Sequence, residues 1–187
     1  MLFRSDATDR AALQRARDEV VRRFGAIHGI VHSALALGDQ GMAAMTEEQL
    51  AASLAAKVDG SVRLAQVFAA DAPDFVLFFS SVQSFFRNPG QGNYAAGCTF
   101  QDAFARLLAQ HWRCTVRVMN WGWWGGVGVA ANPAHAARMR AVGLASIEPE
   151  DAWPALATLL AGPWPQLALV KTAARGDTPP TEPQPPR

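Results

Sequence analysis

The sequence predicts an α/β fold in which helices cover both faces of a parallel, doubly wound β-sheet. Short apolar runs alternate along the chain with amphipathic stretches of ten or more residues, which is the pattern of successive βαβ units. Several apolar runs end in serine, histidine or asparagine, so polar side chains are expected at the carboxyl edge of the sheet, where such folds bind ligands. Half of the residues are hydrophobic and 18% are charged, as in ordinary globular proteins.

Composition also argues against several classes of function. The formal net charge of the 187 residues is +1 and no basic run occurs, so neither nucleic acid nor an anionic membrane is an expected partner. The apolar runs are too short to span a bilayer, and the N-terminus has no signal-peptide pattern. Cys98 and Cys114 form neither a disulfide framework nor a metal cluster. We therefore expect a reduced, cytoplasmic setting and no metal.

Apolar runs flanked by turn-forming residues predict the strands. The run at 75–79 is the most continuous, which is typical of a fully buried strand, and it ends in Ser80 and Ser81. In chain order, strands are expected at residues 2–5, 27–32, 75–79, 115–119 and 167–170.

Capping residues mark the starts of the intervening helices. Thr8 or Asp9 can cap the first helix, and Gly25 ends it. Thr46 begins the second helix with Gln49 in the capping-box position, and this helix runs to a break at residues 73–74. Two shorter helices are expected at 132–140 and 148–160.

A glycine-rich segment at 90–98 leads into a further helix and holds Tyr94, the only tyrosine of the chain. Gly90 and Gly92 permit a tight turn, and Asn93 is a good N-cap for a helix that reaches about residue 110. The tyrosine and the serines that end the preceding strand can share one crevice; the alternative is a capped helix with a half-buried tyrosine. The inner face of the helix is expected to carry Phe100, Phe104, Leu107 and Leu108.

The beginning of the chain departs from the usual nucleotide-binding pattern. A Rossmann-like sheet normally opens with a strand, a glycine-rich turn and a helix whose N-terminus holds the pyrophosphate. No G-x-G-x-x-G-like turn precedes Asp6. The sequence therefore predicts a Rossmann-like doubly wound parallel sheet that is truncated at the N-terminus and occupies residues 1–172. A proline-rich disordered tail or linker is expected at 173–187.

Taken together, the segments at 4–172 resemble the ketoreductase domain of modular polyketide synthases, in the short-chain dehydrogenase/reductase superfamily. The finer pattern around residues 97–100 and 119–125 is most similar to synthases whose acyltransferase acts in trans. The resemblance is carried by six motifs in the order and spacing of the family: Asp6-Ala7-Thr8-Asp9, Gly29-Ile30-Val31-His32-Ser33-Ala34, Ala55-Ala56-Lys57-Val58-Asp59-Gly60, Phe78-Phe79-Ser80-Ser81, Gly90-Gln91-Gly92-Asn93-Tyr94-Ala95-Ala96 and Asn120-Trp121-Gly122-Trp123-Trp124.

The resemblance implies a catalytic set of Tyr94, Ser81 and Lys57. Cys98 occupies a position at which these ketoreductases usually carry asparagine, and a thiol is a weaker hydrogen-bond partner than a carboxamide. In the implied reaction, Ser81 and Tyr94 donate hydrogen bonds to a ketone oxygen that becomes negatively charged, and the Lys57 ammonium favours the phenolate. Taken singly, Lys57 is better interpreted as a helix lysine with its head in water, and Ser81 as a strand-end serine that caps backbone groups. Their joint spacing with Tyr94 favours the catalytic interpretation instead.

The resemblance also implies an NADPH site. Asp6 and Ala7 match positions at the adenine, and Trp121 and Gly122 match the chain around the nicotinamide carboxamide. His32, Ser33 and Ala34 match the strand end that lines the central ribose, although His32 can also be a hydrogen-bonded core residue.

Three positions bear on the substrate. The family motif Leu-Asp-Asp reads Leu37-Gly38-Asp39, and Phe86 replaces the tryptophan of the opposite stereochemical class, which together favour the B-type, D-hydroxy product. Gln91 either touches the substrate arm or caps the turn. The implied substrate is a β-ketoacyl thioester on an acyl carrier protein, and the implied partners are the other domains of a polyketide synthase.

Two hypotheses of function follow. The leading one is an NADPH-dependent ketoreductase core. The alternative is a non-catalytic structural remnant of such a domain, which the missing phosphate-binding turn and Cys98 favour. A serine hydrolase is excluded because no G-x-S-x-G elbow surrounds Ser81.

Overall fold

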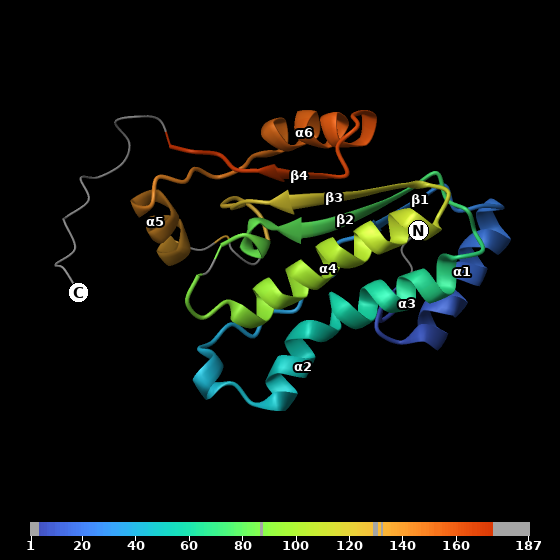
Figure 1. Cartoon of the computed structure of the whole chain (residues 1–187), viewed down its shortest axis with the longest axis horizontal. Coiled ribbons are helices and arrows are strands. Elements are labelled where there is room, and N and C mark those ends of the chain that lie inside the picture. The colour runs from blue at the N-terminus through green and yellow to red at the C-terminus, as the bar shows by residue number, and fades with distance from the viewer. Residues whose placement is uncertain (1–3, 87, 129–130, 132, 174–187) are drawn as a thin grey trace.

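The computed structural model describes residues 4–86, 88–128, 131 and 133–173, and it confirms the parallel α/β fold. Four parallel strands lie side by side in chain order (Figure 1). They are β1 (Gly29–His32), β2 (Phe75–Ser81), β3 (Thr115–Trp121) and β4 (Gln166–Leu169). Because all four run in one direction, their carboxyl ends meet at one edge of the sheet.

Helices cover both faces of this sheet (Figure 1). The helices are α1 (Arg10–Phe24), α2 (Glu47–Ala55), α3 (Val58–Phe68), α4 (Gly92–His111), α5 (Pro133–Ala141) and α6 (Pro149–Ala161), with short 3-10 turns at Met42–Ala44 and Val82–Ser84. Helices α3 and α4 pack on one face, and α6 packs on the other. Among the described helices, none is long and apolar enough to cross a membrane.

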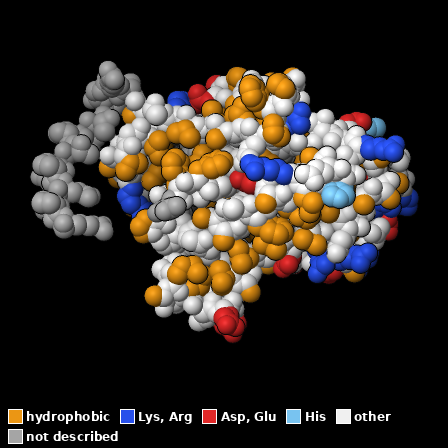
Figure 2. Space-filling model, viewed as in Figure 1, with side chains coloured by type: hydrophobic (Ala, Val, Ile, Leu, Met, Phe, Trp, Pro, Cys, Tyr) orange, Lys and Arg blue, Asp and Glu red, His pale blue; other side chains and the backbone are white. Residues whose placement is uncertain are grey.

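The core has two halves because strand side chains alternate between the faces of the sheet. Val76 and Phe78 of β2 pack toward α3 and α4, while Leu77 packs toward α6. The first half contains Leu64, Val76, Phe78, Ala105, Leu108, Val116 and Val118, and the second contains Leu77, Met119, Trp121, Ile147, Ala152 and Leu159. Apolar side chains also gather on the outer surface over α6 (Figure 2), where Trp153 is 70% exposed.

Two expected elements differ from the observed ones. Arg4 and Ser5 are not in a strand, and the remainder of the strand expected at 2–5 lies outside the described residues. The helix that begins after Thr46 has the expected capping box, but it is broken between α2 and α3. At the break the Lys57 N–H bonds to the Leu54 carbonyl at 3.0 Å, a tighter turn than that of an α-helix, and the Lys57 side chain turns into the protein.

Helix α4 buries a different face from the one expected. Leu108 is buried and Phe104 packs beside the core as predicted, but Leu107 is 51% exposed. Asn93 does not cap the helix; its Nδ2 donates to the Gly38 carbonyl oxygen at 3.3 Å instead. The buried residues of α4 are Asn93, Gly97, Cys98, Gln101, Asp102, Ala105 and Leu108. The inner face is therefore largely polar near its N-terminal end.

A matched pair of substitutions on α6 tests the second half of the core. Leu159→Ala is expected to lower the free energy of unfolding by about 2–5 kcal/mol, because the Leu159 side chain is fully buried and its removal leaves a cavity. Leu160→Ala is the control, since Leu160 is 38% exposed, and its cost should stay below about 1 kcal/mol. Chemical denaturation of both variants gives the comparison; equal losses would contradict this description of the core.

His32 at the end of β1 is buried beside Phe78, with 5.7 Å between the ring centroids. Its Nδ1 accepts a hydrogen bond from the Ala34 N–H at 3.3 Å. Burial, followed by the nearby Lys57 charge, lowers the pKa of His32 from 6.5 to about 4. The imidazole is therefore neutral in the folded protein at neutral pH.

This lowered pKa predicts a loss of stability in mild acid. Because the unfolded state binds the proton more readily, the contribution of neutral His32 is complete above the unfolded pKa and is lost as the pH falls from about 6.5 toward about 4. Between neutral pH and about pH 5, the unfolding free energy of each protein should fall. The fall should be about 2 kcal/mol smaller in His32→Gln than in the unsubstituted protein. His28→Gln, which removes an exposed imidazole, is the control. Parallel losses in all three proteins would contradict the prediction.

Candidate active site

The carboxyl ends of β2 and β3 form the floor of the candidate site. Ser81 is the last residue of β2 and pairs with Trp121 in register. Ser81 is only 7% exposed; its hydroxyl donates to the Trp121 carbonyl oxygen at 3.3 Å and accepts from the Gln83 N–H at 3.2 Å. Two strands and the following turn thus fix the position of this hydroxyl.

Lys57 lies inside the protein beneath α4. The residue is only 4% exposed, so the interpretation of a lysine with its head in water is wrong. Its Nζ donates to the Phe79 carbonyl oxygen and to Gln101 Oε1, both at 3.0 Å, and lies 5.7 Å from the centroid of the Tyr94 ring. Burial lowers the pKa of Lys57, while Cys98 and Asp102 raise it.

Tyr94 stands in the first turn of α4, close enough to the Ser81 and Cys98 side chains for both to influence the pKa of its phenol. Burial raises the pKa of Tyr94 well above its usual value, and Cys98 and Asp39 raise it further, whereas hydrogen bonding with Ser81 lowers it. The phenol is therefore in its proton-bearing form at neutral pH.

Cys98 lies one turn after Tyr94 on the same face of α4 and is fully buried. Burial raises the pKa of its thiol, while the Lys57 charge and hydrogen bonds with Tyr94 and Ser80 lower it. The structure thus brings together the four residues predicted for catalysis, Tyr94, Ser81, Lys57 and Cys98. Their catalytic roles remain a prediction.

Two of the predicted substrate residues, Asp39 and Gln91, lie near α2. Gln91 Nε2 donates to Asp39 Oδ2 at 2.8 Å, so this glutamine joins the start of α4 to the 37–39 loop. A hollow of about 410 Å³ lies next to this contact, and its lining includes Leu37, Asp39 and Ser53. Phe86 is 50% exposed.

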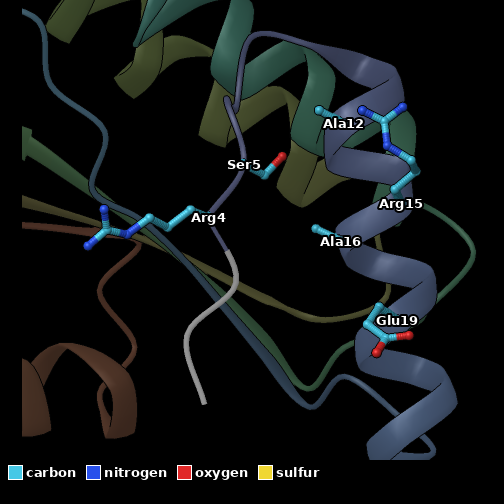
Figure 3. Close-up of a pocket in the computed structure, with 6 residues that line it drawn as sticks. All are labelled: Arg4, Ser5, Ala12, Arg15, Ala16 and Glu19. Carbon is cyan, nitrogen blue, oxygen red and sulfur yellow. The ribbon is translucent and has the colours of Figure 1, made fainter.

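The predicted cofactor residues are more dispersed. Asp6 is exposed and its Oδ1 accepts from both the N–H and the hydroxyl of Thr8, at 2.8 Å each; these bonds lower the pKa of Asp6. Ser33 is exposed directly after buried His32, and Ala34 is half-buried. Gly122 approaches β4 so closely that an added Cβ would lie 2.7 Å from the Leu169 carbonyl oxygen. A separate hollow of about 260 Å³ between Arg4 and α1 contains none of the predicted catalytic residues (Figure 3).

Several polar residues of the site were not found from the sequence. Gln101 accepts a hydrogen bond from the Lys57 amine. It follows Tyr94 by seven residues, or two turns of α4, and this spacing could have placed it on the same helix face in the sequence analysis. Asn120 Nδ2 donates to the Ser81 carbonyl oxygen and to Asp102 Oδ2, both at 3.0 Å. Because Asn120 and Asp102 stand on different elements, only the folded structure reveals this contact.

Comparison with known proteins agrees with this geometry. The model of the KR domain family matches residues 1–126. The chain is 52% identical over 171 residues to "Polyketide synthase PksN" of Bacillus subtilis (strain 168), and 52% identical over 170 residues to "Polyketide synthase ThaG" of Burkholderia thailandensis. Each alignment covers 91% of this chain but only 3% of the relative, so the chain spans a small part of these synthases.

Solved structures give the same result. A ketoreductase domain from the bacillaene assembly line superposes with a TM-score of 0.84 at 27% identity, over 91% of this chain and 42% of that one. An A1-type ketoreductase superposes with a TM-score of 0.82 at 30% identity, over 89% of this chain and 35% of that one. With the parallel sheet and the matching family model, these similarities lead to one conclusion: the chain belongs to the ketoreductase (KR) domain family of polyketide synthases, within the short-chain dehydrogenase/reductase fold.

Proposed function

We propose that this chain reduces the β-ketone of an acyl thioester on an acyl carrier protein to the β-alcohol, with NADPH as the reductant, during polyketide assembly. The observation that carries the proposal is the convergence of Tyr94, Ser81 and Lys57 at the carboxyl edge of the sheet. A phenol, a hydroxyl and a buried amine come from three separate segments, and chance burial does not account for such a set. The partner domains of a synthase, the relation to trans-acyltransferase systems and a cytoplasmic location remain predictions.

Donors and acceptors among the described residues suit a nicotinamide cofactor. The exposed Asp6 carboxylate can accept from an adenine amino group, and Ser33 offers a hydroxyl to a ribose. Trp123 Nε1 and Gln83 Oε1 are buried without a hydrogen-bond partner in the described part of the chain. They follow β3 and β2, and an indole donor and an amide acceptor are the types of group that a carboxamide can satisfy. When bound, the reduced nicotinamide would supply the hydride.

Ser81 and Tyr94 act on the ketone oxygen. Their hydroxyls donate hydrogen bonds to it, and these bonds strengthen as negative charge grows on that oxygen. Tyr94 then transfers its phenolic proton, so that the tyrosine O–H bond breaks and the alcohol O–H bond forms. The raised pKa of Tyr94 keeps this proton available near neutral pH. The Lys57 ammonium, 5.7 Å from the ring centroid, stabilises the phenolate that remains.

A second candidate function is structural. It is favoured by Cys98, whose buried thiol stands beside Tyr94 and is a weaker hydrogen-bond partner than a carboxamide. A non-catalytic domain would show no NADPH binding by calorimetry in the full-length protein, whereas the reductase proposal requires it.

Removal of single hydroxyls tests the proposal directly. In the full-length protein, Tyr94→Phe should lower kcat for NADPH oxidation with a β-ketoacyl thioester by roughly a thousandfold, because the proton donor is lost. Ser81→Ala should lower it by about a hundredfold or more, because one of two hydrogen bonds to the oxygen is lost. Thr99→Ala, which deletes an exposed hydroxyl on the same helix α4, is the control and should leave kcat unchanged. Full activity in Tyr94→Phe would remove the proposal.

A further inference from the structure

We infer that Gln101 is the positioning residue of Lys57, and that it holds the amine under Tyr94 with a neutral acceptor. This inference rests on the proposed function, because it assigns Lys57 its role beside the phenol. Gln101 lies two helical turns after Tyr94 on the inner face of α4 and is completely buried.

The contact has only one chemically consistent orientation. An ammonium has three donors and no acceptor, so the Gln101 carboxamide must present its oxygen to Lys57. Oε1 lies 3.0 Å from Nζ, and the Phe79 carbonyl oxygen lies at the same distance on the strand side. In the described part of the chain, these two oxygens are the hydrogen-bond acceptors of Nζ.

Helix α4 holds the rest of the lysine as well. An added Cβ at Gly97 would lie 3.4 Å from Cβ and Cδ of Lys57, so the aliphatic stem lies against the backbone at Gly97. Gln101 stands four residues later, which places its carboxamide one turn along the same face, at the amine. One helix therefore holds both the stem and the head of Lys57 and also carries Tyr94.

The absence of a charge on the Gln101 side chain favours the proposed reaction. The titratable groups around the amine are Tyr94, Cys98 and Asp102 on α4 and His32 on β1. A carboxylate at position 101 would hold the ammonium more tightly, but it would also add a negative charge where Tyr94 must become negative. A carboxamide supplies the hydrogen bond without that repulsion.

The chain is well suited to a spectroscopic test, because it contains only two lysines, Lys57 and Lys171. With isotope-labelled lysine, NMR can follow the titration of each amine. Lys171, which pairs with Asp151 and is distant from Lys57 in the sequence, is the internal reference. Gln101→Met keeps the size of the side chain and removes the acceptor. It should lower the Lys57 pKa by roughly one to two units relative to the unsubstituted protein.

Two further variants complete the design. Gln101→Glu should raise the Lys57 pKa, yet lower kcat by about tenfold or more because the added charge opposes the phenolate. Gln110→Met makes the same change as Gln101→Met at an exposed position of α4 and should alter neither quantity.

The outcomes separate the inference from the proposed function. A Lys57 pKa that is unchanged in folded Gln101→Met overturns the inference, even if Tyr94→Phe abolishes reduction. If Gln101→Met does not fold, Gln101→Glu decides: an unchanged Lys57 pKa overturns the inference and a raised one supports it. If the Lys57 pKa shifts as expected in the Gln101 variants but the unsubstituted protein reduces no ketone, the contact between Gln101 and Lys57 is supported and the proposed function is contradicted.

Discussion

The buried amine of Lys57 is the constraint on which the geometry of the site depends. Removing an ammonium from water costs several kcal/mol unless acceptors surround it. Here the acceptors come from the Phe79 carbonyl on β2 and the Gln101 side chain on α4. The amine therefore keeps its partners only while the break between α2 and α3, strand β2 and helix α4 hold their relative positions. The same packing sets Tyr94 above the end of β2.

Polar contacts extend this arrangement behind the site. Asn120 is fully buried and joins the Ser81 backbone to Asp102 through two hydrogen bonds of 3.0 Å. Gln166 Nε2 donates to Asp102 Oδ2 at 3.0 Å and to Asn120 Oδ1 at 2.7 Å. The ends of β2 and β3, the start of β4 and α4 are thus tied together by directional bonds. Such a network fixes the Ser81 hydroxyl more narrowly than apolar packing alone.

The fold was largely predictable from the sequence, because apolar runs and caps report local structure. The strand at 75–79 and the capping box at Thr46 were both found from such signals. The inner face of α4 was not predictable in this way. A search for apolar residues selects Leu107, whereas the buried face carries Cys98 and the polar Gln101 next to the candidate site. The break at Lys57 was missed for a related reason: it is stabilised by contacts of the side chain in the folded protein, and no glycine or proline marks it.

The site was predictable in its residues but not in its electrostatics. Spacing and resemblance brought Tyr94, Ser81 and Lys57 to notice, and the structure places them together. The raised pKa of Tyr94 depends chiefly on burial in the folded protein, which the sequence does not encode locally. Tyr94 is consequently a protonated donor rather than a preformed phenolate.

A crystal structure of the full-length protein with NADP⁺ and a β-hydroxyacyl thioester is the most direct measurement of this claim. We predict that the β-hydroxyl oxygen lies within about 2.6–3.2 Å of both the Tyr94 and the Ser81 hydroxyls, with the Lys57 amine still bound by Gln101. A substrate oxygen held by other groups, with Tyr94 out of hydrogen-bond reach, would contradict the account.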